Sequence, residues 1–310
     1  MIRTTQPDAI QPFLKHVYIP PKDAHKGQNG KVLIIGGSSL FHAASLWAAE
    51  IASHFVDMVH YASTQENNEI MAHLKTTFRN GIVIHRKDIP HYIEEDDAIL
   101  IGPGMMRSES KKQHLASRHQ SFAEILNLSD EGALTRGLTH HILSVYPHKQ
   151  FVIDAGALQM MEPSWLTKLS RPAIITPHLK EFEELFEMSL DGLSIEEKAK
   201  HTEERAREYK CVIVLKSIDD VVTDGTTTHI VRGGNQGLAK GGTGDVLAGL
   251  IVSLAAKNDP IPSAVLASFV EKRAAESLFE KKGYWYNVSE LIATIPEVFH
   301  RITCHLKRKT

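Results

Sequence analysis

Residues 233–250 read GGNQGLAKGGTGDVLAGL, with seven glycines and one carboxylate, Asp245, where the sequence turns apolar. After Gly244 the apolar residues recur at i, i+3 and i+4, which predicts a buried helix that stops at Asn258 and Pro260. A helix start offers unpaired backbone N–H groups and a positive partial charge, and glycines let an anion come close. The stretch is therefore either a flexible loop with a capping aspartate or an anion-binding site in which Asp245 takes part in proton transfer.

Two common phosphate-binding motifs are not indicated. The Gly30-Lys31 pair is followed by Val32 rather than Ser or Thr, so the chain has no Walker A loop. The first glycine turn, GGSSLFHAAS (36–45), does not match the G-x-G-x-x-G pattern of dinucleotide-binding Rossmann folds.

Short β-branched runs alternate with helical segments along most of the chain. Continuous apolar runs are typical of strands buried on both faces of a parallel sheet. They predict a three-layer α/β/α fold with a mostly parallel central sheet. A hairpin with its turn at Asp224-Gly225 is expected over VVTDGTTTHIVRG (221–233). The expected strands are KVLIIGGSS (31–39), DMVHYAS (57–63), GIVIH (81–85), DAILIGPG (97–104), FVIDAG (151–156), PAIITPH (172–178) and CVIVLKS (211–217).

Glycines or reactive side chains stand at several of these strand ends. They are Gly36-Gly37, Gly102-Pro103-Gly104, Asp154, His178 and Lys216. In open α/β sheets ligands bind beyond the carboxyl ends of the strands, so these groups predict a pocket at that edge.

Composition excludes several classes of function. The 310 residues are 42% hydrophobic and 23% charged with a formal net charge of -2, which favours neither nucleic acid nor an anionic membrane. The N-terminus has no apolar signal region, and two cysteines, Cys211 and Cys304, build no disulfide framework, so a cytoplasmic protein is expected. The 18 histidines are scattered, without zinc-ligand spacing.

The domain organisation is expected to be simple. Residues 1–24 are interpreted as an N-terminal extension and 25–300 as the domain, with a polar insertion within about 105–135. Residues 301–310 form a short basic tail.

GGTGDVLAG resembles the signature of the ADP/ATP-dependent NAD(P)H-hydrate dehydratases, a ribokinase-like family of nicotinamide repair enzymes. The resemblance runs from about residue 25 to about 295 and includes HKGQNGKVLIIGGS (25–38), AILIGPG, FVIDAGAL, ITPHLKEF and VIVLKS, in order. It implies dehydration of hydrated NADH or NADPH at the expense of ADP or ATP, with Mg²⁺. Several family members form homo-oligomers, and the same is expected here. The epimerase domain of many bacterial members is not expected, because about 24 residues precede His25.

The resemblance also implies a role for individual residues. Asp245 would be the general base, and the N–H groups of Gly242, Thr243 and Gly244 would hold the transferred phosphoryl group. Glu181 stands where related kinases place a carboxylate near Mg²⁺, although a first-turn glutamate is equally an ordinary helix residue. Substrate-binding residues would be Ala43, Gly104, His178 and Asp245; nucleotide-binding residues would be Lys216, Ser217, Ile218, Asp219, Gly242, Thr243 and Gly244.

The chain departs from the family pattern mainly on the substrate side. Gly156 replaces the second aspartate of an Asp-Ala-Asp-Ala-Leu segment, and Leu179-Lys180 replace Pro-Gly after His178. His42 occupies a position that is usually glycine. Three functions therefore stay open: the dehydratase, a ribokinase-like kinase of a small vitamin alcohol or sugar, and a non-catalytic nucleotide-binding protein.

Overall fold

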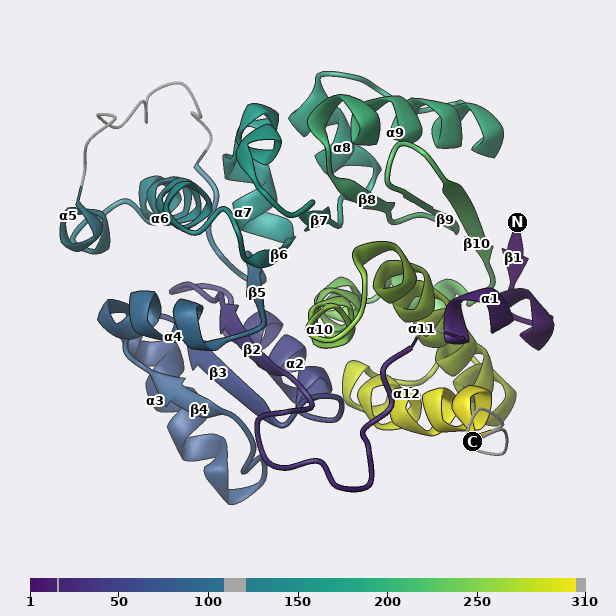
Figure 1. Ribbon diagram of the computed structural model, residues 1–310, viewed down its shortest axis with the longest axis horizontal. Helices are drawn as coiled ribbons and strands as arrows, with labels where there is room; N and C mark the ends of the chain where they lie inside the picture. The colour runs from purple at the N-terminus through teal and green to yellow at the C-terminus, as the bar shows by residue number, and fades with distance from the viewer. Residues whose placement is uncertain (16, 109–120, 305–310) are drawn as a thin grey trace.

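The computed structural model describes residues 1–15, 17–108 and 121–304. Within these residues a ten-stranded sheet runs in the order β1-β10-β9-β8-β7-β6-β5-β2-β3-β4 (Figure 1). The stretch from β8 to β4 is parallel, and β9 and β10 form the expected hairpin at one side. The strands are β1 (Ile2–Arg3), β2 (Lys31–Ile35), β3 (Met58–Ala62), β4 (Ile82–Ile84), β5 (Ala98–Ile101), β6 (Gln150–Ile153), β7 (Ile174–Ile175), β8 (Val212–Leu215), β9 (Asp219–Thr223) and β10 (Thr228–Arg232).

Helices cover both faces of the sheet, as a three-layer fold requires. Successive strand residues face opposite layers: Val32 and Ile34 belong to one core cluster, Leu33 and Ile35 to the other. Buried residues of α2, α3, α10, α11 and α12 pack in the first cluster, and those of α4 to α9 in the second. The helices are α1 (Gln11–Leu14), α2 (Ala43–Ala52), α3 (Gln65–His73), α4 (Ile89–Glu95), α5 (Phe122–Leu126), α6 (Glu131–Val145), α7 (Ala155–Met160), α8 (Leu179–Phe186), α9 (Ile195–Tyr209), α10 (Thr243–Ala255), α11 (Pro260–Lys282) and α12 (Val288–Thr303).

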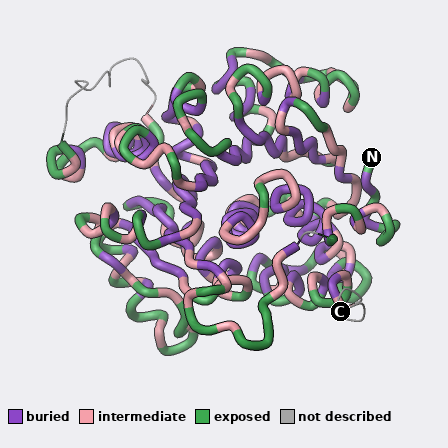
Figure 2. The backbone as a smooth tube through the Cα atoms, in the orientation of Figure 1, coloured by how far each residue is buried: buried purple, intermediate pink, exposed green. Residues whose placement is uncertain are grey.

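The helix predicted from the opening glycine stretch is α10, and it lies in the middle of the molecule (Figure 2). Every residue from Val246 to Ala255 is buried. Gly249 allows the close approach of α2, because a Cβ there would lie 2.6 Å from the Ala48 carbonyl oxygen. Such a helix is fixed by packing, so the residues of its first turn are held rigidly at the edge of the sheet.

The first residues of the chain pack into the same core. Ile2 pairs with Val231 of β10, which adds β1 to the edge of the sheet. Ile10 and Leu14 are fully or almost fully buried against α11 and its neighbours. The segment interpreted as an extension therefore contributes a strand and core side chains to the domain.

Two other sequence expectations fall partly outside the described residues. The centre of the polar insertion, 109–120, and the end of the basic tail, 305–310, lie there. On the C-terminal side of the insertion, α5 begins with a complete capping box between Ser121 and Glu124.

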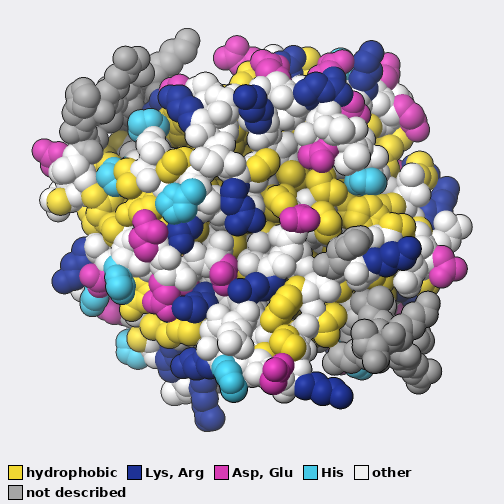
Figure 3. All heavy atoms as spheres, viewed as in Figure 1, with side chains coloured by type: hydrophobic (Ala, Val, Ile, Leu, Met, Phe, Trp, Pro, Cys, Tyr) yellow, Lys and Arg dark blue, Asp and Glu magenta, His cyan; other side chains and the backbone are white. Residues whose placement is uncertain are grey.

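The surface carries charges of both signs, in keeping with the small net charge. On the face shown in Figure 3, hydrophobic side chains are most continuous across the middle of the molecule. Among the described residues, no helix has both the length and the apolar character needed to cross a membrane.

Candidate active site

Adjacent parallel strands place the first functional pair side by side. Beyond β7 and β8 the backbone continues as a parallel bridge between His178 and Lys216, and the Lys216 N–H donates to the Pro177 carbonyl at 2.8 Å. The side chain of Lys216 thereby extends from the carboxyl edge of the sheet, as the sequence predicted for strand-end groups.

Lys216 meets two carboxylates at that edge. Its ammonium donates to Asp154 Oδ1 at 2.8 Å and lies 4.0 Å from Glu181 Oε2. Thr176 donates to the same Asp154 oxygen at 2.7 Å. Burial alone would lower the pKa of Lys216, but the charges of Asp154 and Glu181 outweigh it and raise that pKa. A permanently charged ammonium therefore stands beside the sheet edge.

Glu181 has a structural role in the turn before α8. Its Oε2 accepts the His178 N–H at 2.9 Å, while His178 Nδ1 accepts the Glu181 N–H at 3.2 Å, which is a reciprocal capping box. Its Oε1 accepts from Gln159 at 3.0 Å. Both oxygens thus accept from one protein donor each, and each keeps a second lone pair for a cation.

The described residues do not form a metal cage of their own. No group of three or more His, Cys, Asp or Glu side chains among them is placed to hold a metal ion. Mg²⁺ in nucleotide sites is held largely by phosphate oxygens and water, with one or two carboxylates. Glu181 therefore stays a proposed ligand of an Mg²⁺ ion that the nucleotide phosphates would carry.

The first turn of α10 lies against this cluster. An ideal Cβ on Gly244 would lie 3.4 Å from the Lys216 ammonium nitrogen. Gly242 caps the helix with φ 103°, and a Cβ there would strike the Trp47 ring at 2.4 Å. Both the left-handed backbone and the close packing therefore require glycine at this position.

Thr243 anchors the loop to the helix. Its hydroxyl donates to the Leu238 carbonyl at 2.7 Å, and its N–H donates to the Lys240 carbonyl at 3.3 Å. The N–H of Thr243 therefore already has a partner, which leaves those of Gly242 and Gly244 as the better placed donors of the three expected from the sequence.

Asp245 has the chemistry of a base that works near neutral pH. Its pKa is raised to about 7: burial is the largest cause, the charges of Asp154 and Glu181 act in the same direction, and Lys216 opposes them. A base whose pKa lies close to the working pH combines adequate ionisation with adequate basicity. The surroundings of Asp245 thus differ from those of a solvated capping residue.

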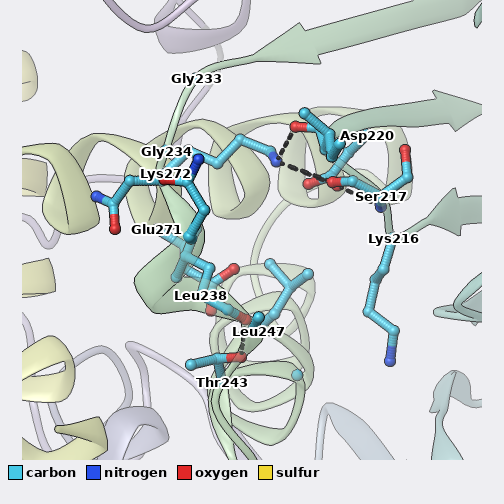
Figure 4. A pocket seen from close by; sticks show the side chains of 15 residues that line it. Lys216, Ser217, Asp220, Gly233, Gly234, Leu238, Thr243, Leu247, Glu271 and Lys272 are labelled. Carbon is cyan, nitrogen blue, oxygen red and sulfur yellow. Dashed lines mark hydrogen bonds and ion pairs between the residues drawn. The ribbon is translucent and has the colours of Figure 1, made fainter. Parts of the chain in front are cut away.

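A cavity of about 470 Å³ opens beside this helix start (Figure 4). Five of the seven residues expected to bind the nucleotide line it: Lys216, Ser217, Ile218, Thr243 and Gly244. Gly242 and Asp219 are not in its lining. Asp219 instead accepts a hydrogen bond from Arg232 at 2.9 Å across the β9–β10 hairpin.

The expected substrate-side residues lie around neighbouring glycine turns. Gly104, with φ 70°, packs against Phe41 and Ala44 at the start of α2, next to Ala43. His42 Nδ1 lies 2.5 Å from the Asn67 Oδ1, which ties the start of α2 to α3. The side chain of His178 is half exposed. Gly156 cannot carry a side chain without rearrangement, because a Cβ would lie 2.1 Å from the Met105 carbonyl oxygen.

Sequence reasoning missed the part of the cavity that α11 contributes. Glu271 and Lys272 line it and are almost completely buried. Lys272 reaches Asp220 Oδ1 at 3.3 Å and the Ile218 carbonyl at 3.0 Å (Figure 4). The segment SFVEKRAAESLFEKK (268–282) has the charge density of an exposed helix, so the sequence did not indicate that Glu271 and Lys272 would be buried.

Comparison with known proteins agrees with this architecture. A family model described as NAD(P)H-hydrate dehydratase matches residues 32–297. A bifunctional NAD(P)H-hydrate repair enzyme Nnr of Methanocaldococcus jannaschii is 35% identical over 286 residues, which are 89% of this chain and 49% of that protein. An ADP-dependent (S)-NAD(P)H-hydrate dehydratase of Nitrosopumilus maritimus is 28% identical over 293 residues, with 92% of this chain and 95% of the relative covered.

A solved structure has the same fold. The ADP/ATP-dependent NAD(P)H-hydrate dehydratase of Bacillus subtilis, co-crystallised with ATP and Mg²⁺, superposes with a TM-score of 0.76 at 23% identity over 94% of this chain and 97% of that one. The ribokinase-like fold expected from the resemblance is thus confirmed. This chain spans about half the length of the bifunctional relatives that it matches. Because the family model covers most of its residues, the chain belongs to the NAD(P)H-hydrate dehydratase family.

Proposed function

We propose that this protein dehydrates hydrated NADH or NADPH to NADH or NADPH, with ADP or ATP as the phosphoryl donor. The observation that carries the proposal is Asp245, with its pKa of about 7, in the first turn of α10 beside a cavity of nucleotide size. Family membership supports the reaction, and the names of relatives such as the ADP-dependent dehydratase of Nitrosopumilus maritimus support the nucleotide.

In the proposed first step, Asp245 accepts the proton of the hydrate's hydroxyl group while that oxygen attacks the terminal phosphorus of the nucleotide. The bond from this phosphorus to the bridging oxygen breaks, and the shortened nucleotide leaves with the electron pair. Phosphoryl transfer of this kind depends mainly on positioning and on charge neutralisation.

The residues around Asp245 match those two requirements. The N–H groups of Gly242 and Gly244 at the start of α10 would hold the phosphoryl oxygens, with the Lys216 ammonium beside Gly244. Mg²⁺ carried by the phosphates would neutralise further charge.

In the proposed second step, phosphate leaves the phosphorylated hydrate with the carbon–oxygen electron pair. A proton leaves the adjacent ring carbon, and the ring double bond is restored. The balance is one nucleotide hydrolysed at its terminal phosphate for each hydrate dehydrated.

The test is an assay with chemically hydrated NADH, Mg²⁺, and either ATP or ADP. We expect the reduced nicotinamide absorbance to return with the wild-type protein. With Asp245→Asn the rate should fall about 10²–10⁴-fold, the usual contribution of a general base. Nucleotide binding by this variant, measured by calorimetry, should persist.

The same assay decides between the other functions. Because the departures at His42, Gly156 and Leu179 lie on the substrate side, small alcohols such as pyridoxine and hydroxyethylthiazole are included. Nucleotide consumption with one of these alcohols, and none with the hydrate, would replace the dehydratase by a kinase. Saturable nucleotide binding without any turnover would indicate a non-catalytic protein.

A further inference from the structure

The cavity beside α10 contains a buried carboxyl group that no protein group satisfies. Glu271, on α11, is 5% exposed and lines the cavity. Its Oε1 is buried and has no hydrogen-bond partner among the described residues. Buried polar groups in folded proteins almost always have a hydrogen-bond partner, so an unsatisfied one needs an explanation.

The cations nearby are committed to other groups. Lys272, the next residue, donates to the carbonyls of Ser217 and Ile218 and pairs with Asp220 at 3.3 Å. The second oxygen of Asp220 accepts from Ser268 at 2.7 Å. Lys216 points to Asp154 at 2.8 Å. Glu271 is therefore left as an acceptor that faces the cavity, between Lys272 and Leu238 in Figure 4.

The chemistry of the cavity limits what can meet Glu271. A metal ion would need more ligands, and the described residues place no group of three or more His, Cys, Asp or Glu together. The groups suited to bind phosphate, the Gly244 N–H and the Lys216 ammonium, line another part of the cavity. The walls contributed by Leu238 and Leu247 are apolar, which suits a flat aromatic base.

We propose that Glu271 reads the base of the nucleotide by accepting a hydrogen bond from the exocyclic amino group of adenine. The proposal rests on the nucleotide site of the proposed function, and adds to it the residue that selects the base. A base that lacks this amino group would leave the buried Glu271 oxygen without a hydrogen-bond partner. The site would therefore bind such an analogue more weakly.

The protonation of Glu271 supports this assignment. Its pKa is raised to about 8: burial is the largest cause, the charge of Asp220 acts in the same direction, and Lys272 and Lys216 oppose them. At neutral pH most of the carboxyl groups are protonated, so each offers one acceptor oxygen and one O–H donor. The amide side chains that read adenine elsewhere offer the same pair, an acceptor for the amino group and a donor for a ring nitrogen.

The experiment measures the binding of ATP, purine riboside triphosphate, which lacks the amino group, and inosine triphosphate, which carries an oxygen in its place. Dissociation constants are determined by calorimetry for the wild-type protein, Glu271→Leu and Glu271→Gln. We expect the wild type to prefer ATP to purine riboside triphosphate by about tenfold, the value of one good hydrogen bond. Glu271→Leu should bind the two equally, and Glu271→Gln, which keeps an acceptor and a donor, should retain the preference.

Each outcome bears on the proposal. Glu271→Leu with the wild-type preference would overturn it, and so would Glu271→Gln that loses the preference while its thermal unfolding is unchanged. If Glu271→Leu fails to fold, Glu271→Met takes its place, with the same expectation that it binds ATP and purine riboside triphosphate equally. A wild-type protein that binds no purine nucleotide would overturn the nucleotide site of the proposed function as well. Binding without discrimination by the amino group would overturn the role of Glu271 alone.

Discussion

The Lys216 ammonium lies 2.8 Å from Asp154 Oδ1, so a cation after β8 is paired with a carboxylate after β6. The side chain of Asp154 is 2% exposed and that of Lys216 is 19% exposed. The same ammonium lies next to Gly244 in the first turn of α10. Lys216 therefore connects the acidic groups of the sheet edge to the proposed phosphate site.

Replacing this lysine should destabilise the protein. Lys216→Met leaves the buried carboxylates of Asp154 and Glu181 without their cation, which should cost about 3 kcal/mol in urea unfolding. Lys257→Met is the matched control, because its partner Asp97 is a third exposed and such surface pairs contribute at most about 1 kcal/mol. Equal losses in the two variants would contradict the structural role of Lys216.

The dehydratase rate should depend on the ionisation of Asp245. Because burial raises the pKa of Asp245 to about 7, the base is protonated and inactive at lower pH. We expect kcat/KM to fall about tenfold for each pH unit below about 7, since only the ionised fraction reacts. Asp154→Asn removes a negative charge that raises this pKa, so its profile should break at lower pH. A wild-type profile that is flat down to pH 5 would exclude Asp245 as the base.

The raised pKa of Asp245 should also appear in the stability of the protein. The folded state holds a proton on Asp245 between its ordinary pKa of 3.8 and about 7, whereas the unfolded state releases it. The free energy of unfolding therefore falls as pH rises through this window. Asp245→Asn cannot ionise, so its stability relative to the wild type should increase from pH 5 to pH 8. A difference that stays constant with pH would mean that burial does not raise the pKa of Asp245.

Much of the site could be predicted from the sequence because parallel strands end at one edge. The apolar runs before Asp154 and Lys216 indicated buried strands, and the glycine stretch before Asp245 indicated a helix start at the same edge. The structure brings these three residues together without any adjacency in sequence. Local patterns were sufficient because each residue stands at the end of its own element.

Other features depended on contacts between distant segments. Glu271 lines the same cavity as residues of η5 (Gln236–Ala239) and of the β8–β9 loop, and nothing in its own helix distinguishes it from an exposed glutamate. In the N-terminal segment, Thr4 packs closely against Gly233. A Cβ at Gly233 would lie 2.0 Å from the hydroxyl oxygen of Thr4. From the sequence, Glu181 could be a metal ligand or an ordinary first-turn acid. Its reciprocal hydrogen bonds with His178 in the structure show that it caps α8.

The glycine at 156, where the family pattern has an aspartate, should be required by packing. A Cβ at Gly156 would lie 2.1 Å from the Met105 carbonyl oxygen, whereas a Cβ at Gly241 has no heavy atom within 4 Å. Gly156→Ala should therefore lose about 2 kcal/mol in urea unfolding, in the range found for overpacked sites. Gly241→Ala should change stability by less than about 1 kcal/mol, and toward greater stability, because alanine restricts the unfolded chain. If both variants unfold alike, the turn at Met105 can move aside, and the departure from the family pattern at Gly156 is not imposed by that turn.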